Sequence, residues 1–412
     1  MELSAFIDDP RVRGSIQSLR RDVGESVFSD IVDDGGRQYV DLVMEGGGVL
    51  GISLVGYTYA LESVGIRFLG VGGTSAGSIN ALLMAALDAL DRPKSQKILA
   101  WLADVDLFSF VDGDPDARRM VEAVVQNAGT PTLVYRGIQV LDNLFGHLGL
   151  NPGEAFYGWI KDRLAEAGIT TNRELRERMV PSDGTQLRTR SGVTLSRGEL
   201  DARLSIVTAD LTTETKVDFP RMAALYWADP DEVNPAEFVR ASMSIPVFFH
   251  PHRVGPVPHG PSATANWLAL AHYSGKIPDE VFFVDGGTIS NFPIDLFHQP
   301  GVPLAPTFGV KLGLERSEPR RIATPIEYMR AVFEAARNGM DNDFLVKHQD
   351  YRHLIAYIQT GDHYWLDFKL PDEAKVDLFH RGVEAAGQFL RGFQWERYKR
   401  IRAGLDHTER GA

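Results

Sequence analysis

The sequence predicts an α/β fold with a mostly parallel central sheet. Two apolar runs, 38–44 and 66–71, are typical of buried strands, and each leads through a Gly-rich loop into apolar residues at helical spacing. A strand–loop–helix unit that repeats at once forms a right-handed crossover between parallel strands. The two Gly-rich loops are therefore expected at the same edge of the sheet, which is where open α/β sheets bind their ligands.

Further elements follow in order along the chain. Residues 1–38 are expected to form one or two helices and a polar turn. The stretch 92–180 is expected to be largely helical, and the polar stretch 182–200 to be a surface loop or hairpin. The predicted Gly/Pro breaks in the helical stretch are at 113–115, 129–131 and 149–153. Later strands are predicted at 204–209, 281–284, 307–312 and 354–359, and later helices at 235–241, from 325 and from 372.

Composition excludes several classes of protein. The chain has 412 residues, of which 44% are hydrophobic and 24% charged, so collagen-like, coiled-coil and wholly disordered classes are excluded. It contains no Cys, which excludes disulfides, thiolate catalysis and Cys-ligated metal centres. The net charge of −12 argues against nucleic acid as the main partner.

The sequence shows no signal for membrane insertion or export. The longest apolar stretch, Ile79 to Leu87, is far shorter than the ~20 residues that a membrane-spanning helix needs. The N-terminus lacks the basic start and apolar run of a Sec signal peptide. We therefore expect a cytoplasmic protein, and leave peripheral contact with a membrane open.

The segment Gly73-Thr74-Ser75-Ala76-Gly77 matches the nucleophile-elbow pattern G-x-S-x-G. An elbow needs an apolar strand, a sharp turn and a helix in that order, and the sequence here predicts all three. Its neighbours must be small because the serine backbone is strained and the strand and helix approach closely. The helix that begins at Ala76 would point its positive end at the serine oxygen. Ser75 is therefore predicted as a nucleophile, and a tight turn ending in a helix cap is the alternative.

The first Gly-rich loop, Gly46-Gly47-Gly48, is predicted to form an oxyanion hole. Consecutive glycines let backbone N–H groups converge on one point, whereas a plain turn between strand and helix needs only one or two. The spacing of Gly46, Gly48 and Gly51 also fits a dinucleotide fingerprint. That fingerprint requires an acidic residue at the end of the second strand, but residues 66–76 contain no Asp or Glu. A nucleotide-binding protein is the competing interpretation of this loop.

Ser75 needs a base, and Asp285 is the best candidate. It ends a fully apolar run and is followed by Gly286-Gly287, which leave space around its carboxylate. A carboxylate about 2.6–3.2 Å from a serine hydroxyl can accept its proton if partial burial raises the basicity of the carboxylate. Asp210 also ends a strand, but it precedes residues typical of a hairpin and is expected to be a turn residue.

The histidines allow two other interpretations of the site, a Ser-His-Asp triad and a metal site. Residue types alone allow a Ser-His-Asp triad, although none of the histidines after Asp285 lies in a distinctive setting. These histidines are His298, His348, His353, His363 and His380. His250, His252 and His259 cluster with three prolines, where metal binding is the alternative to a surface or structural role. No metal and no cofactor are predicted.

Three motifs in this order resemble those of the patatin-like phospholipase family. They are Glu45-Gly46-Gly47-Gly48-Val49-Leu50-Gly51, Gly73-Thr74-Ser75-Ala76-Gly77 and Asp285-Gly286-Gly287. The stretches 150–154, 241–246 and 291–293 also resemble bacterial members. The resemblance implies a catalytic domain over 39–315 after an N-terminal segment 1–38. It also implies a helical cap insertion at 92–200 and a C-terminal extension, 316–412, packed on the same domain.

The family resemblance implies a three-layer α/β/α sandwich and a serine lipid acyl hydrolase of the phospholipase A or lysophospholipase type. The implied machinery is a Ser75–Asp285 dyad that needs neither histidine nor metal. The implied oxyanion donors are backbone N–H groups at Gly46, Gly47, Gly48 and Ala76, supported by Gly51, Gly73, Gly77, Gly286 and Gly287. The implied partner is a membrane phospholipid or lysophospholipid.

One residue departs from the family pattern, because Leu50 stands where the family usually has Arg or Lys. Amide donors do not depend on that side chain, so the oxyanion hole should remain. Any role of the charge in fixing the loop or binding a lipid phosphate would be lost. A catalytically silent lipid-binding or regulatory module is therefore the alternative function.

Two apolar clusters, 247–249 and 267–270, flank a Pro/Gly-rich loop that contains histidines. If exposed, they would contact a membrane surface, and if buried, they belong to the core. The acidic net charge means that a strongly anionic membrane would repel the average surface of the protein.

Overall fold

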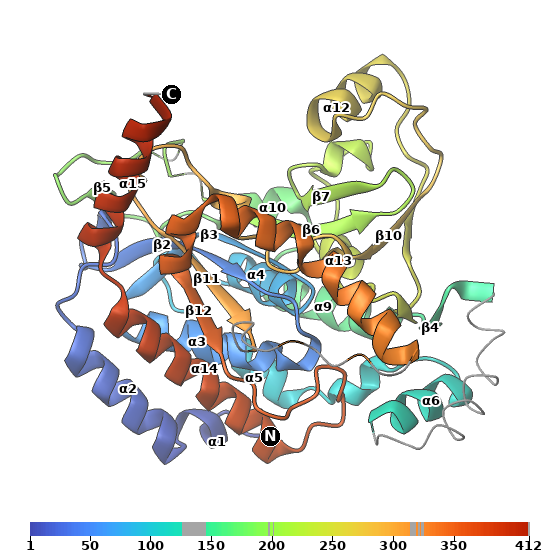
Figure 1. The fold of residues 1–412 in the computed structure, drawn as a ribbon, viewed down its shortest axis with the longest axis horizontal. Helices are drawn as coiled ribbons and strands as arrows, with labels where there is room; N and C mark the ends of the chain where they lie inside the picture. Colours follow the sequence, from blue (N-terminus) through green and yellow to red (C-terminus); the bar gives the residue numbers. More distant parts are fainter. Residues whose placement is uncertain are drawn as a thin grey trace.

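The computed structural model describes residues 1–125, 146–196, 198–200, 202–313, 319, 322 and 325–410. Within these residues a ten-stranded sheet forms the middle of the molecule, with helices packed on both of its faces (Figure 1). Its main path has the order β12-β11-β2-β3-β6-β10-β9. The predicted α/β class with a mostly parallel sheet is confirmed.

The parallel part of the sheet brings the two Gly-rich loops together. Strands β12, β11, β2, β3 and β6 pair in parallel, and β2 and β3 are direct neighbours. These strands are β2 (Gln38–Met44), β3 (Ile66–Thr74), β6 (Leu204–Asp210), β11 (Thr307–Leu312) and β12 (Ile355–Ile358). The loops after β2 and β3 therefore leave the same edge of the sheet, as the sequence predicts.

The other strands run antiparallel to their neighbours. Strand β10 (Val281–Asp285) pairs with β6 and with β9 (His252–Val254), and β7 (Thr215–Phe219) forms a hairpin with β6. Short strands β1 (Ile31–Asp33) and β5 (Leu187–Thr189) pair beside β2, so part of the polar stretch 182–200 joins the sheet. Strands β4 (Gly149–Asn151) and β8 (Val247–Phe249) make a separate ribbon.

Helices cover both faces because residues of each strand point alternately to the two sides. On β3, Val71 lines a small cavity with Glu62 of α3 and Met84 of α4, whereas the next residue, Gly72, approaches Leu296 of the short η5 turn (Ile294–Phe297). The helices are α1 (Ser4–Ile7), α2 (Pro10–Val23), α3 (Gly51–Ser63), α4 (Ala76–Ala86), α5 (Ser95–Asp104), α6 (Pro115–Val125), α9 (Glu154–Glu166), α10 (Asn172–Arg178), α11 (Ala236–Ser242), α12 (Pro261–Ala271), α13 (Pro325–Lys347), α14 (Asp372–Gly392) and α15 (Trp395–Arg410).

The segments before and after the predicted domain join the same body. In Figure 1, α2 and α14 lie side by side, and α14 also packs along α3. Strand β12 extends the sheet beside β11. The limits given for the catalytic domain, cap and extension stay predictions, and the break predicted at 129–131 lies outside the described residues.

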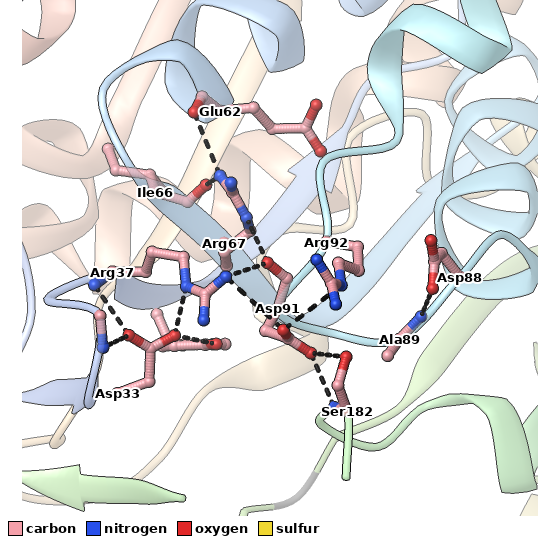
Figure 2. Close-up of polar contacts among 12 residues, drawn as sticks. Asp33, Arg37, Glu62, Ile66, Arg67, Asp88, Ala89, Asp91, Arg92 and Ser182 are labelled. Atoms are coloured by element: carbon pink, nitrogen blue, oxygen red, sulfur yellow. Dashed lines mark hydrogen bonds and ion pairs between the residues drawn. The ribbon is translucent and has the colours of Figure 1, made fainter. Parts of the chain in front are cut away.

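A buried polar network lies where β3 begins, at the end of the sheet away from the Gly-rich loops (Figure 2). Arg67 donates to the carbonyl oxygens of Glu62, Ile66 and Asp91 at 2.7–3.1 Å. The Asp91 carboxylate accepts two hydrogen bonds from Ser182, each 2.7 Å long. Because these buried charged groups form hydrogen bonds within the fold, we interpret the network as structural.

Candidate active site

Ser75 lies at a strained turn between β3 and α4. Its backbone has φ 51° and ψ −122°, a combination that L-residues rarely adopt. Its N–H donates to the Ser242 hydroxyl at 3.0 Å, and that hydroxyl donates to the Val207 carbonyl oxygen at 2.7 Å. The turn is therefore tied to α11 and β6, and the Ser75 side chain, in a residue only 4% exposed, is held in one place.

The glycines of the elbow are required by the close approach of β2. A Cβ atom added at Gly77 would lie 2.2 Å from the Met44 carbonyl oxygen, and one at Gly73 would lie 2.5 Å from the same atom. Neither contact is possible for a real side chain. A Cβ atom at Gly46 would lie 3.0 Å from the Ser75 Cβ, so the first Gly-rich loop is in contact with the elbow.

Asp285 reaches Ser75 from an antiparallel strand. Thr74 pairs with Val207, and the next residue of β6, Thr208, pairs with Asp285, so Ser75 and Asp285 lie at the same level on either side of β6. The Ser75 hydroxyl lies close enough to the Asp285 carboxylate to lower the pKa of that carboxyl group. The Asp285 carboxylate also accepts the Gly287 N–H at 2.7 Å.

Burial raises the pKa of the Asp285 carboxyl group above its ordinary value. The positive charge of Arg337 and the hydrogen bonds from Ser75 and Gly287 oppose that shift, and burial outweighs them. A raised pKa makes the ionised carboxylate a stronger base toward a serine hydroxyl.

The first Gly-rich loop presents backbone donors beside Ser75. Among the described residues, no acceptor is found for the N–H groups of Gly47, Gly48 or Ala76. Gly48 has a φ of +55°, and the Trp365 carbonyl oxygen would be 2.2 Å from a Cβ atom there. The N–H of Gly46, named above as an oxyanion donor, instead donates to the Asn291 carbonyl oxygen at 3.1 Å. Three of the four expected donors are therefore available.

An apolar cavity of about 70 Å³ opens over Ser75. Its floor is the elbow and the first Gly-rich loop, and its walls come from several other elements. Within the stretch 92–200, α5, η2 (Leu107–Phe110) and α9 contribute to it, and Phe368 comes from the C-terminal region. The lining side chains include Ile79, Leu102, Phe110, Phe156, Trp159 and Met243. Such a cavity suits a hydrocarbon chain.

The histidines lie elsewhere. In the described part of the chain, no histidine hydrogen-bonds to Ser75 or Asp285. His298 binds Tyr351, His363 binds Asp377, and His380 pairs with Glu384. The ring of His348 is tilted against that of Phe344, and His353 and Phe393 line the same small cavity. The geometry thus gives no support to a Ser-His-Asp triad.

The three clustered histidines are also separated by their partners. His252 binds Glu237 at 2.7 Å, His259 pairs with Asp279, and His250 stacks on His147. Within the residues that the structure describes, no group of three or more His, Cys, Asp or Glu side chains could hold a metal ion.

Asp210 and the two apolar clusters behave as structural residues. Asp210 accepts hydrogen bonds from Thr212, Thr213 and Tyr226 at the β6–β7 turn. Phe248, Phe249 and Trp267 are buried. Val247 and Leu268 of these clusters are exposed, at 56% and 55%, and Ala269 is exposed as well. Leu50 is buried where α3 begins, so the position that is basic in the family lies in the core here.

The motifs did not reveal four residues that contact this site. Arg337 and Asp341 of α13 bind the segment 290–292 and the first Gly-rich loop. Trp365 accepts the Val49 N–H at 3.0 Å, and Phe368 lines the cavity. The only sequence signal was weak: Arg337 and Asp341 are four residues apart, which places them on one face of a helix.

The model of the family described as patatin-like phospholipase matches residues 42–298. The chain belongs to the patatin-like phospholipase family. The match includes both Gly-rich loops and Asp285, and it ends before β11 and the helices that follow. Membership of the patatin-like phospholipase family indicates a lipid acyl hydrolase.

Other relatives extend over more of the chain. The uncharacterized protein YqhO of Bacillus subtilis (strain 168) is 28% identical over 364 residues, covering 87% of this chain and 99% of YqhO. Among solved structures, VipD from Legionella pneumophila has a TM-score of 0.43 at 15% identity, covering 89% of this chain and 71% of VipD. A chain of the ExoU–SpcU complex from Pseudomonas aeruginosa has a TM-score of 0.32 at 17% identity, covering 86% of this chain and 52% of its own length. Both TM-scores are below 0.5, so these two overall likenesses are weak.

Proposed function

We propose that the protein is a serine lipid acyl hydrolase that cleaves fatty-acyl esters through a Ser75–Asp285 dyad. The observation that carries this proposal is the approach of the Ser75 hydroxyl to the Asp285 carboxylate at a strained strand–helix turn. The N–H groups beside Ser75, for which the described residues offer no acceptor, and the apolar cavity above it support the same reaction. Metal and cofactor have no part in the proposed steps.

The first half of the reaction transfers the acyl group to Ser75. Asp285 accepts the hydroxyl proton as Oγ attacks the ester carbonyl carbon and the new C–O bond forms. The carbonyl oxygen becomes an oxyanion, to which the N–H groups of Gly47, Gly48 and Ala76 would donate. The bond to the alcohol oxygen then breaks, and that oxygen takes the proton from Asp285 and leaves as a lysolipid or smaller alcohol.

The second half releases the fatty acid. Water gives its proton to Asp285 and attacks the acyl carbonyl carbon. The bond from this carbon to Ser75 Oγ breaks, Oγ takes the proton back from Asp285, and a carboxylic acid leaves. Because one carboxylate receives and returns the proton in both halves, the dyad needs no histidine.

We infer that the substrate is a membrane phospholipid or lysophospholipid. The apolar lining of the cavity would contact the part of the acyl chain nearest the ester, and its walls from the stretch 92–200 support the proposed cap. Within the described residues, no helix combines the length and the apolar character that crossing a bilayer requires. We infer that lipid is taken from a membrane surface by peripheral contact.

Ester hydrolysis by two variants tests the proposal. Ser75→Ala and Asp285→Asn should each lower turnover of p-nitrophenyl acyl esters and of phospholipid vesicles by at least about a hundredfold. Ser274→Ala and Asp279→Asn, at exposed positions, should leave turnover unchanged. Wild-type turnover that persists in both site variants would rule out the dyad. Binding of vesicles without turnover by the wild type would instead favour a silent lipid-binding module.

A further inference from the structure

Helix α13 forms hydrogen bonds with residues 290–292, which follow Asp285. The Asp341 carboxylate accepts the Ser290 hydroxyl at 2.6 Å and the Phe292 N–H at 2.7 Å. Arg337, one helical turn earlier, donates to the side-chain oxygen of Asn291. Two residues of one helix face thus hold three consecutive residues. Asp341 is only 4% exposed.

The same contacts fix the peptide that presents the Gly47 N–H. Arg337 Nη2 and Asn291 Nδ2 both donate to the Gly46 carbonyl oxygen, each at 3.2 Å. A trans peptide is planar, so fixing the direction of this C=O also fixes the Gly47 N–H, which points the opposite way. Hydrogen bonds to the carbonyl also polarise the peptide, which makes its N–H a better donor. The Gly47 N–H is one of the amide groups left without an acceptor in the described part of the chain.

Arg337 is also the charged neighbour of Asp285. A Cβ atom added at Gly287 would lie 2.8 Å from the Asp285 carboxylate and 3.1 Å from Arg337 Nε, so the two charged groups flank this glycine. Within the described structure, Arg337 Nε is buried and has no hydrogen-bond partner. The guanidinium group therefore sits at the site with one donor unused.

We propose that Arg337 is a positioning residue for the dyad reaction: it fixes the Gly46–Gly47 peptide as an oxyanion donor and supplies the cation beside Asp285. This inference rests on the proposed function. Arg337 lies on a helix beyond residue 298, where the family match ends. In the first Gly-rich loop, the position that is usually basic in the family is occupied by the buried Leu50. Asp341 fixes the segment around Asn291, and Asn291 donates to the same Gly46 carbonyl oxygen as Arg337.

The lysines whose charge acts on Asp341 have partners of their own. Lys311 of β11 pairs with Glu45 at 3.4 Å, and Lys216 of β7 pairs with Asp295. Asp341 is occupied by Ser290 and Phe292. Asp285 itself faces the Ser75 hydroxyl from the elbow, the Gly287 N–H from its own strand end and Arg337 from α13. A change in the pKa of Asp285 on loss of Arg337 would thus measure the effect of the Arg337 charge.

The test compares Arg337→Met, which removes the charge, with Arg337→Lys, which keeps it but loses the planar fork. Two rates are measured against pH: kcat/KM for a short-chain nitrophenyl ester, and covalent labelling of Ser75 by a fluorophosphonate. Arg337→Met should lower both rates by about 10- to 100-fold and move their acid limbs to higher pH, because Asp285 loses a cation that favours its ionised form. Arg337→Lys should restore the acid limb but only part of the rate.

Lys347→Met is the matched control, since it removes an exposed positive charge from the same helix. It should change neither rate. Thermal unfolding of every variant separates loss of fold from loss of positioning. Equal rate losses in Arg337→Met and Arg337→Lys with unmoved acid limbs would overturn the proposal and leave Arg337 a purely structural tie. Absence of Ser75 labelling in the wild type would instead refute the dyad itself, so the two failures are distinguishable.

Discussion

The carboxylate of Asp285 lies where an ionised group is unfavourable. The residue is 6% exposed, and burial raises its pKa despite Arg337 and two hydrogen-bond donors. A group with a higher pKa in the folded state than in the unfolded state stabilises the fold while it is protonated. That contribution is lost as pH rises through the raised pKa. At neutral pH the proposed base therefore favours reactivity at the expense of stability.

We expect Asp285→Asn to be more stable than the wild type at pH 8, because the neutral amide avoids the cost of burying an ionised carboxylate. The amide keeps the shape of the carboxylate and can still accept the Gly287 N–H. The difference should shrink toward acid pH, where the wild-type carboxyl group is itself protonated. Urea unfolding at pH 8 and pH 5 measures both points. A variant that is less stable than the wild type at pH 8 would contradict this account.

At the scale of elements, two glycines set the distance between α3 and α14. A Cβ atom at Gly382 of α14 would lie 1.9 Å from the Ser53 carbonyl oxygen, and one at Gly56 of α3 would lie 2.0 Å from the Phe379 carbonyl oxygen. The two helix backbones are therefore in direct contact. Since α3 begins at the first Gly-rich loop, this contact also supports the proposed oxyanion hole.

Gly382→Ala should push the two helices apart. We expect a loss of about 2–3 kcal/mol in the free energy of unfolding, as for other overpacked sites, together with lower ester turnover. Gly392→Ala is the control at the end of the same helix, where an added Cβ atom meets nothing within 4 Å. Its stability should change by no more than about 1 kcal/mol. Chemical unfolding of both variants gives the comparison, and equal effects would show that the close contact is unimportant.

Local patterns predicted those elements whose side chains alternate or recur within a short window. Strands 38–44 and 307–312 have the predicted limits, and the helix predicted from 372 begins there. The strand predicted at 66–71 continues to Thr74, because Gly72 and Gly73 pair with β2 even though they add no apolar side chain. The short strands β1, β5 and β9 were not predicted. Each has three residues and depends on a distant partner, which no local window contains.

The same reasoning applies to the site. Ser75 and Asp285 could be proposed from the sequence because each ends a strand and is followed by small residues. The approach of their side chains depends on the register of β3, β6 and β10, which fixes the level of each residue. Arg337 and Trp365 belong to no motif, and their contacts with the first Gly-rich loop come only from how the C-terminal part of the chain folds back.

At the scale of the whole molecule, the part of the chain after β11 completes the central domain. Strand β12 covers the edge of β11, α14 covers the buried helix α3, and Trp365 holds the first Gly-rich loop. The aromatic contacts agree, since Phe308 of β11 packs against Phe389 and Phe393 at 4.8 and 5.0 Å. Described residues after β11 therefore contribute to the hydrophobic core.

We expect a chain truncated after residue 313 to fail to fold. It would expose the apolar side of α3 and leave β11 as an uncovered edge strand, which favours aggregation. It would also lack Arg337, Trp365 and Phe368 at the site. Gel filtration and circular dichroism measure its fold, and fluorophosphonate labelling measures the reactivity of its Ser75.

A truncation before α15, ending at residue 394, is the control. It keeps β12, α13 and α14 and should remain folded, though less stable because Trp395 and Tyr398 are lost from the core. A soluble, labelled 1–313 fragment would instead mean that the family-matched region folds and forms its site alone.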